Sequence, residues 1–255
     1  MSVAIITGAS SGLGRAYARA LSRDPSIHEI WAVARRAGRL EELSALCACP
    51  VRPLPMDLTK PSSLDELQTM LETERPAVSV LVCAAGFGKM GETETVSPQD
   101  NADMIDLNCR AAVAVTMLCL PWMTRGGRIL EISSTSAFSP MPGLNLYAST
   151  KAFLLQFTKT LHYELRGQGI HVTAVCPYWI LDTEFIPTAQ EDKPGSYHRF
   201  PLATRTESVV ERSLRASRRN RWVCTPGLVC SLHRVGAKLL PDALLVRVSD
   251  LLRRL

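Results

Sequence analysis

The feature that most constrains the fold of this chain is a regular alternation of short apolar runs with longer amphipathic stretches. Nearly continuous apolar runs are typical of parallel strands that helices cover on both faces. Strands and helices that alternate in this way predict right-handed crossovers and a doubly wound α/β sheet of about seven parallel strands. The predicted strands are residues 3–7, 29–34, 78–84, 127–132 and 171–176, with weaker ones at 51–55 and 221–224.

The stretches between these runs carry the helices, and one long segment breaks the pattern. A chain of 255 residues has the length of one large α/β domain, so we expect a single domain over residues 1–255. Segment 178–205 is rich in proline, aromatic and polar residues, which predicts a substrate lid. A basic helical region is expected at 206–255. The predicted helices are residues 12–23, 39–46, 62–72, 98–123, 145–166, 206–218, 228–239 and 243–255.

Composition argues against several classes of protein. The hydrophobic content of 46% is that of a globular chain, and we expect no apolar run as long as a membrane span and hence no transmembrane segment. A strand that begins at residue 2 leaves no room for a signal peptide, so a cytoplasmic location is predicted. The eight cysteines form no paired C-x-x-C elements with metal-site spacing. This predicts no metal site and a reducing compartment.

The net charge of +5 is unevenly distributed. Residues 201–255 hold eleven Arg or Lys against four Asp or Glu, whereas the rest of the chain is slightly acidic. Such a region can meet a nucleic acid or an anionic membrane, but no nucleic-acid motif accompanies it, so we predict a solvated helix surface and no nucleic-acid partner. The helices at 228–239 and 243–255 are amphipathic and basic, which leaves peripheral membrane contact and subunit packing both open.

A glycine-rich turn, TGASSGLG at residues 7–14, joins the first strand to the first helix. Glycines at such a junction let backbone amides approach a phosphate, and the helix N-terminus favours the negative charge. The spacing G-x-x-x-G-x-G matches neither the G-x-G-x-x-G fingerprint nor a P-loop, so the turn alone is also compatible with a structural loop. The residues expected to contact a dinucleotide here are Gly8, Ser10, Ser11, Gly12, Leu13 and Gly14.

The end of the second predicted strand discriminates between two dinucleotides. An acidic residue there binds a free ribose 2'-hydroxyl, whereas a basic residue accommodates a 2'-phosphate. The strand ends in Ala34-Arg35-Arg36, without an acid. Following a phosphate-binding turn, this predicts NADP in preference to NAD, with Arg35 making the contact and Arg36 beside it. Merely solvated arginines are the alternative.

A tyrosine and a lysine stand one helical turn apart in the segment YASTK, residues 147–151. Side chains at i and i+4 lie on the same face of a helix, so a cation at Lys151 can stabilise the ionised form of Tyr147. Without such help, ionising a tyrosine with a pKa near 10 costs roughly 4 kcal/mol at neutral pH. Taken alone, the spacing is also that of an ordinary helix surface, and the other motifs must decide.

Together these motifs resemble those of the short-chain dehydrogenase/reductase family over nearly the whole chain. The resemblance implies a Rossmann-like single domain, an NAD(P)-dependent enzyme and a homodimer or homotetramer. The matching residues, in the family's order and spacing, are the turn at 7–14, Asp57, Leu58, Ala84, Ala85, Gly86, Asn108, Ser134, Tyr147 and Lys151.

The resemblance also implies a role for each matching residue. Ser134 hydrogen-bonds the substrate oxygen, and Tyr147 exchanges the proton. Lys151 lowers the pKa of the tyrosine and binds the nicotinamide ribose, while Asn108 holds a water molecule in the proton relay. Asp57 and Leu58 meet the adenine, and the remaining expected cofactor contacts are Ala84, Ala85, Gly86, Pro177, Ile180 and Thr183.

Two departures from the family pattern limit these assignments. The usual Asn-Asn-Ala-Gly begins with Cys83 here, so side chains that tie the central sheet together are absent, which should affect stability more than chemistry. The usual Pro-Gly is Pro177-Tyr178, and Thr183 lies one residue further along than usual. The bulky pair Tyr178-Trp179 is expected to reshape the substrate pocket.

The sequence therefore predicts an NADP(H)-dependent oxidoreductase that interconverts a small-molecule carbonyl, ketone or aldehyde, and an alcohol. A non-catalytic NADP-binding regulator and a sugar-nucleotide epimerase or dehydratase are the alternatives. The lid composition indicates an apolar and bulky substrate, such as a steroid, a bile acid or a lipid-derived ketone. The lid residues behind this interpretation are Trp179, Phe185, Ile186, Tyr197 and Phe200.

Overall fold

Seven parallel strands form one sheet in the order β3-β2-β1-β4-β5-β6-β7, which confirms the predicted doubly wound α/β fold. The structure is a computed structural model and describes residues 2–190 and 195–254. The strands are β1 (Ser2–Thr7), β2 (Glu29–Ala34), β3 (Val51–Pro55), β4 (Ala77–Cys83), β5 (Met123–Ile132), β6 (His171–Val175) and β7 (Val223–Cys224).

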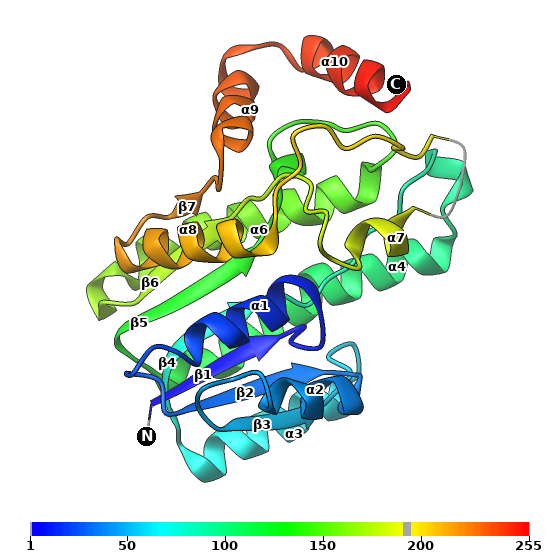
Figure 1. Ribbon diagram of the computed structural model, residues 1–255. Helices are drawn as coiled ribbons and strands as arrows, with labels where there is room; N and C mark the ends of the chain where they lie inside the picture. The colour runs from blue at the N-terminus through cyan, green and yellow to red at the C-terminus, as the bar shows by residue number, and fades with distance from the viewer. Residues whose placement is uncertain (1, 191–194, 255) are drawn as a thin grey trace.

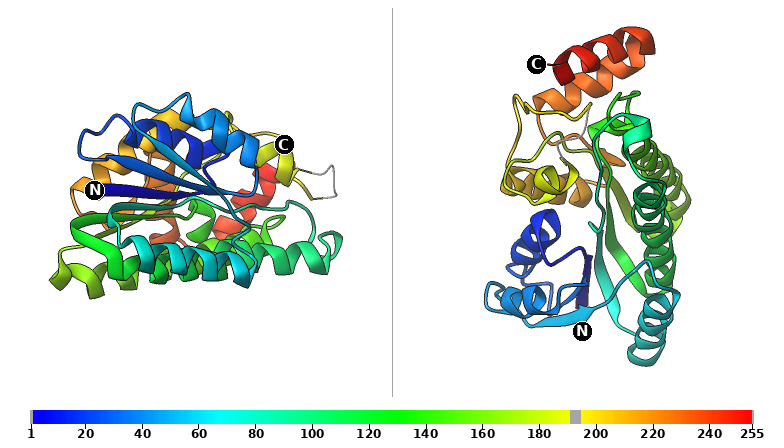
Figure 2. Two further views of the ribbon diagram at one scale, coloured as in Figure 1. Left: turned by 90° about the horizontal axis from the view of Figure 1, so that it is seen from below. Right: turned by 90° about the vertical axis from the view of Figure 1, so that its right-hand side faces the viewer.

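Helices cover both faces of the sheet (Figures 1 and 2), as the apolar character of the strands requires. On one face lie α1 (Gly12–Leu21), α2 (Ala37–Ser44) and α8 (Thr206–Arg218), and on the other lie α3 (Pro61–Glu74), α4 (Pro98–Ile105), α5 (Ala112–Cys119) and α6 (Asn145–Glu164). Each layer closes its own core of buried side chains against the strands.

The chain winds in opposite directions from β1, which lies between β2 and β4. At such a switch point the loops after neighbouring strands separate and leave a crevice beyond the carboxyl ends of the strands. The turn after β1 and the ends of β4 and β5 therefore meet at one edge of the sheet, where the predicted site residues also lie.

The predicted helix at 98–123 contains an irregular turn. Between α4 and α5 the backbone forms a π-helical turn, Asp106–Ala111, and the segment ends in a 3₁₀ turn, Leu120–Trp122. Met123 then begins β5 four residues earlier than predicted, because Met123 pairs with Val78 ahead of an irregularity in the β4–β5 register.

The same helical segment corrects one expectation from composition. Pro98–Trp122 is long and apolar enough to cross a membrane by length and composition alone, whereas we expected no run of that length. In the structure this segment packs against β4 and β5, and 44% of its most apolar window is buried. Its apolar residues thus serve as one side of the sheet's core.

Segment 178–205 is the predicted excursion, and its described part packs on itself. A bridge joins Ile180 to Thr204, and a short helix, α7 (Phe185–Ala189), lies between them. The Trp179 ring contacts Tyr197 and Phe200, with centroids 5.5 Å and 4.8 Å away. Residues 191–194 of this segment lie outside the described residues. The chain ends in α9 (Leu228–Leu239) and α10 (Asp242–Arg254).

Candidate active site

A cleft of about 860 Å³ opens at the carboxyl ends of the strands. It runs from the turn between β1 and α1, past the ends of β2, β4 and β5, to the start of α6 and the lid segment. Every site residue predicted from the sequence lines this cleft except Asn108. One edge of the sheet therefore brings together residues that are up to 175 positions apart in the chain, from Gly8 to Thr183.

The glycine turn is shaped to receive a phosphate. Gly8 and Gly12 adopt left-handed backbone conformations, with φ of +67° and +48°, which other residues rarely adopt. A Cβ atom on Gly8 would lie 2.8 Å from the Ala84 carbonyl oxygen, so the turn packs directly on the end of β4. The side chain of Ser11 does not cap α1, which leaves the first amides of that helix for an anion.

At the end of β2, the arginine that donates hydrogen bonds to the glycine turn is Arg36 rather than Arg35. Its guanidinium donates to Ser10 Oγ from two nitrogens, over 3.2 Å and 3.1 Å. It also pairs with Glu184 at the start of the lid helix, over 2.9 Å. Arg35 lines the cleft beside it. Two cations therefore border the glycine turn where a 2'-phosphate would lie. Sequence reasoning missed Glu184, because no local pattern relates it to residue 36.

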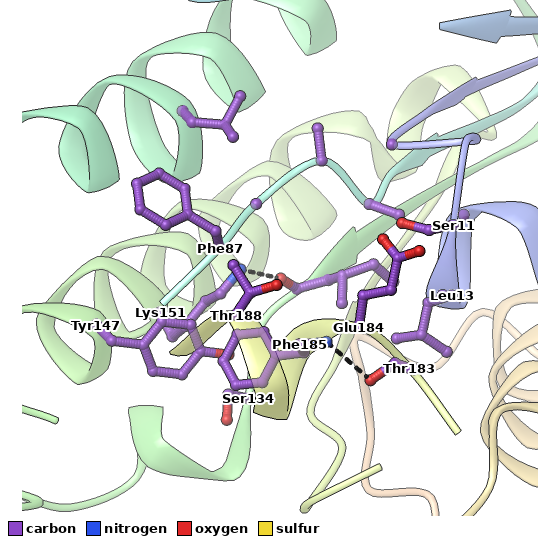
Figure 3. A pocket seen from close by; sticks show the side chains of 18 of the residues that line it. Ser11, Leu13, Phe87, Ser134, Tyr147, Lys151, Thr183, Glu184, Phe185 and Thr188 are labelled. Atoms are coloured by element: carbon purple, nitrogen blue, oxygen red, sulfur yellow. Dashed lines mark hydrogen bonds between the residues drawn. The ribbon is translucent and has the colours of Figure 1, made fainter. Parts of the chain in front are cut away.

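Tyr147, Lys151 and Ser134 meet at the inner end of the cleft (Figure 3). Tyr147 and Lys151 lie on the first two turns of α6 and are buried, and Ser134 follows β5. A hydrogen bond joins the Ser134 hydroxyl to the Tyr147 phenol. Lys151 Nζ donates to the Ile132 carbonyl oxygen over 2.8 Å and stands 5.7 Å from the centre of the Tyr147 ring. The predicted trio is thus brought together in space.

Burial dominates the electrostatics of this trio. It raises the pKa of Tyr147 well above the usual value, and the hydrogen bond with Ser134 offsets only part of the rise. Burial also lowers the pKa of Lys151 to about 8. Lys151 is not among the groups that shift the pKa of Tyr147 in this structure, so its expected effect stays a prediction, and Tyr147 carries its proton at neutral pH. A protonated phenol in this position can donate to the oxygen of a carbonyl.

Asn108 lies behind the cleft, in the π-helical turn, and is fully buried. Its side-chain amide donates to the Phe87 carbonyl oxygen over 2.8 Å and to Thr150 Oγ1 over 3.1 Å. Its oxygen accepts from the Phe87 amide over 3.0 Å. These bonds fix the loop after β4 against α6. The structure thus gives Asn108 a positioning role that sequence reasoning did not anticipate.

The lid segment contributes polar groups opposite the glycine turn. A Cβ atom on Gly12 would lie 3.5 Å from Thr183, so this threonine faces the turn across the cleft. The Thr183 hydroxyl donates to the Ile180 carbonyl oxygen over 3.2 Å and accepts from the Phe185 amide over 3.4 Å. The displaced position of Thr183 in the sequence therefore still leaves it at the cleft.

An apolar pocket adjoins the phenol of Tyr147. The Phe185 ring lies 5.2 Å from the Tyr147 ring, and a Cβ atom on Gly88 would come within 2.9 Å of both rings. A larger residue at position 88 would therefore displace one of the two rings, and the segment Gly86-Phe87-Gly88 was the available sequence signal for this contact. The apolar side chains lining this part of the cleft are Phe87, Met141, Leu144, Trp179 and Phe185.

Comparisons with known proteins agree with this geometry. The family model for short chain dehydrogenase matches residues 2–194. The chain belongs to the short-chain dehydrogenase family. It is 31% identical over 186 residues to the NADP-dependent 3-hydroxy acid dehydrogenase YdfG of Escherichia coli (strain K12), which covers 72% of this chain and 74% of that protein.

Solved structures of other short-chain dehydrogenases share the fold. One from Sphingobium yanoikuyae in complex with NADPH has a TM-score of 0.77 and 27% identity, covering 95% of this chain and 98% of that one. The bulky-bulky ketone specific alcohol dehydrogenase from Comamonas testosteroni has a TM-score of 0.73 and 26% identity, covering 95% and 96%. The chain is thus an NAD(P)-dependent oxidoreductase that acts on alcohols and carbonyls.

In this short-chain dehydrogenase, a buried acid that sequence reasoning missed lies close to the predicted trio of Ser134, Tyr147 and Lys151. Glu131 in β5 is fully buried and lies 2.6 Å from Thr116 Oγ1, which in turn is 3.5 Å from Cys83 Sγ. Burial raises the pKa of Glu131 to about 7. This polar cluster ties β4, β5 and α5 together at the position where the family's asparagine was expected but Cys83 stands.

A Glu131→Gln variant tests whether burial raises the pKa of Glu131, because the two proteins should differ in how their stability depends on pH. A carboxyl whose pKa rises on folding binds more protons folded than unfolded, so wild-type stability is lost as the pH rises from about 4.5 to 7. The neutral amide keeps an acceptor for Thr116 and avoids this loss. As the pH rises from 5 to 8, we expect the free energy of unfolding of the Glu131→Gln variant to increase by about 2 kcal/mol relative to that of wild type, measured by urea unfolding. A difference in unfolding free energy between variant and wild type that stays constant across this range would contradict the raised pKa of Glu131.

Proposed function

We propose that this short-chain dehydrogenase is an NADP(H)-dependent reductase of bulky apolar carbonyl compounds. The observation that carries the proposal is the position of the protonated Tyr147 phenol, between the Ser134 hydroxyl and the Phe185 ring. At this point the polar half of the cleft, built to hold a dinucleotide, meets its apolar half. A carbonyl carbon placed here can receive a hydride while its oxygen faces two hydroxyl groups.

The chain's own residues fit NADP along the polar half. The amides of the glycine turn bind the pyrophosphate, and Ser10, Arg35 and Arg36 receive the 2'-phosphate. NADP-dependent relatives support this preference, although two matched structures, of a 4-hydroxyisoleucine dehydrogenase and its mutant, hold NADH. We assign the adenine to Asp57 and Leu58. The nicotinamide end is assigned to the other predicted cofactor contacts that line the cleft, Ala84, Ala85, Gly86, Lys151, Pro177, Ile180 and Thr183.

The chemistry follows from the arrangement of the catalytic trio. NADPH, when bound, supplies the hydride that bonds to the carbonyl carbon. Ser134 and Tyr147 donate hydrogen bonds to the oxygen as it gains negative charge, and Tyr147 then transfers its proton to complete the alcohol. The Lys151 ammonium lowers the cost of the phenolate that remains. Asn108 positions the loop after β4, and we propose that it also holds the water molecule of the proton relay.

The substrate class follows from the apolar half of the cleft. Aromatic side chains on both the lid and the loop after β4 line it, which favours large apolar groups on the carbonyl. The likeness to a bulky-bulky ketone specific enzyme supports this class.

A panel of carbonyl compounds tests the proposal through NADPH oxidation. We expect turnover of diaryl and steroid ketones. Acetone should be turned over little, because its small groups leave most of the apolar surface of the cleft exposed to water. Tight NADPH binding without turnover of any compound would favour a nucleotide-binding regulator instead. Conversion of a sugar nucleotide without net NADPH oxidation would favour an epimerase.

Cofactor preference gives a second test. Replacing Arg35 by aspartate should weaken NADPH relative to NADH by about tenfold or more, because the 2'-phosphate loses a cationic partner and gains a negative neighbour. Arg23→Asp is the matched control, since it makes the same charge change at an exposed position away from the cleft. Titration with both cofactors measures the ratio. An unchanged ratio for Arg35→Asp would assign the phosphate to Arg36 alone.

We also propose self-association, as the family resemblance implies. The outer surface of α4, α5 and α6 exposes Ile105, Met117 and Phe153, each at close to half of its possible area. Packing this surface against a second copy would remove these side chains from water.

A further inference from the structure

The last two helices stand apart from the rest of the fold. Figures 1 and 2 show α9 and α10 beyond the carboxyl ends of the strands, outside both helix layers. The inner side of α9 is anchored to the body, since Cys230 is buried and His233 Nε2 lies 2.9 Å from Ser139 Oγ. The inner side of α10 is anchored through Ser249, whose Oγ lies 2.8 Å from the Tyr197 hydroxyl. Both helices therefore have a defined outward side.

The outward side carries an unusually continuous set of apolar residues. Positions four, seven and eleven residues apart lie on one side of a helix, and α9 places a leucine or valine at each such position after Leu228. Within α10, Leu244, Val248 and Leu251 repeat the spacings of four and seven, and Leu240 lies between the two helices. We call this set the apolar face of α9 and α10: Leu228, Leu232, Val235, Leu239, Leu240, Leu244, Val248 and Leu251, exposed by 44% to 76%.

A face of this kind needs a partner, because soluble proteins rarely expose contiguous large apolar groups. Lys238 of α9 and Arg247 of α10 are exposed, and helical spacing places each at the edge of the apolar side of its own helix. Residues 228–255 hold five Arg or Lys against two Asp. The partner must therefore be apolar at its centre and complementary to positive charge at its edge.

The charge separates two possible partners. In a symmetric pair of copies, the same basic surface would meet itself, and like charges would face one another at a cost. An anionic bilayer offers acyl chains for the leucines and negative headgroups for the cations. The chain also has separate apolar residues on α4, α5 and α6 for contact with a second copy.

We propose that the apolar face of α9 and α10 docks this enzyme onto an anionic lipid bilayer. The two helices lie in the plane of the interface, with their leucines at the boundary of the acyl chains. The long side chains of Lys238 and Arg247 reach back to the headgroups. Because α10 contacts the lid segment at Tyr197 and Gly195, docking also places the lid at the membrane surface.

Sedimentation of the full chain with vesicles tests this proposal. Vesicles of phosphatidylcholine mixed with phosphatidylglycerol should pellet the protein, and vesicles of phosphatidylcholine alone should pellet much less of it. The double variant Leu232→Glu, Leu239→Glu should bind the anionic vesicles at least about tenfold more weakly, since both leucines leave the acyl boundary. Leu46→Glu is the matched control, an exposed leucine after α2, and should bind as wild type does.

The charge contribution has its own variant. Replacing both Lys238 and Arg247 by glutamate should abolish the preference for anionic over neutral vesicles, and high salt should do the same for wild type. None of these four positions lines the cleft, so NADPH affinity should stay unchanged in every variant and report intact folding. Vesicle binding is measured without any substrate and is therefore independent of the proposed reaction.

Three results would overturn the proposal. The first is failure of wild type to pellet with either kind of vesicle, and the second is a double leucine variant that pellets as well as wild type. The third is a dimer in sedimentation velocity that dissociates in the double leucine variant but not in the Leu46→Glu control, with no vesicle binding by wild type. That result would assign the apolar face to a second copy of the chain.

Discussion

Replacing Tyr147 by phenylalanine is expected to lower kcat for ketone reduction by about a thousandfold, because the variant has no proton to give to the carbonyl oxygen. NADPH affinity should change little. The phenylalanine ring keeps the packing against Phe185, which lies 5.2 Å away, so the fold should survive. Stopped-flow reduction of a bulky ketone, with separate titration of NADPH, gives both quantities.

Tyr163→Phe is the matched control for this variant. It removes the same hydroxyl from the same helix, but from an exposed ring that does not line the cleft. Its kcat should equal that of wild type. Turnover by Tyr147→Phe at a rate within a few fold of wild type would remove Tyr147 as the proton donor.

Replacing Ser134 by alanine should have the second largest effect, a loss of about 100-fold in kcat with little change in KM. The hydroxyl acts on the oxygen only as it becomes negative, so its loss falls on the transition state. Ser134 Oγ also accepts from the Ser136 amide over 3.1 Å, so some stability is lost as well, and thermal unfolding should be measured alongside the kinetics.

The pH profile separates a catalytic from a structural role for Ser134. Its hydrogen bond opposes the rise in the pKa of Tyr147, so the Ser134→Ala variant should raise that pKa further. In the direction of alcohol oxidation, where Tyr147 must be ionised to accept a proton, the limb on which the rate rises with pH should therefore move to higher pH. Ser149→Ala, on the exposed side of α6, should leave both rate and profile unchanged. A Ser134→Ala profile identical to wild type would contradict direct contact with the phenol.

Local sequence patterns predicted many of the residues of this site. The glycine turn depends on the backbone freedom of glycine, and the pair Tyr147 and Lys151 depends on the spacing of one helical turn, which the backbone enforces. Ser134 followed from the family order of motifs. The sheet and most helix bounds were predictable for the same reason, since apolar runs mark strands that are covered on both faces.

What the sequence did not predict depends on contacts between distant residues. Asn108 is separated by 42 positions from Thr150, its hydrogen-bond partner, and Glu184 pairs with Arg36 from the far side of the cleft. The raised pKa of Glu131 arises from burial that only the assembled sheet creates. The early start of β5 depends on an irregular register with β4, which no local propensity records.

The apolar face of α9 and α10 is an intermediate case. Its helical periodicity was visible in the sequence, but an amphipathic helix normally turns its apolar side toward the core. Only the fold shows that Leu228, Leu232 and Leu239 point outward instead.

Transfer of deuterium from NADPH tests the central claim most directly. NADPH carrying deuterium at the hydride-donating carbon of its nicotinamide is mixed with wild-type enzyme and a bulky ketone, and the product is examined by mass spectrometry. We predict an alcohol with one deuterium on the former carbonyl carbon, formed at equal rates by wild type and by Tyr163→Phe and about a thousandfold more slowly by Tyr147→Phe. NADPH bound in the cleft with no deuterated alcohol from any ketone would contradict the account.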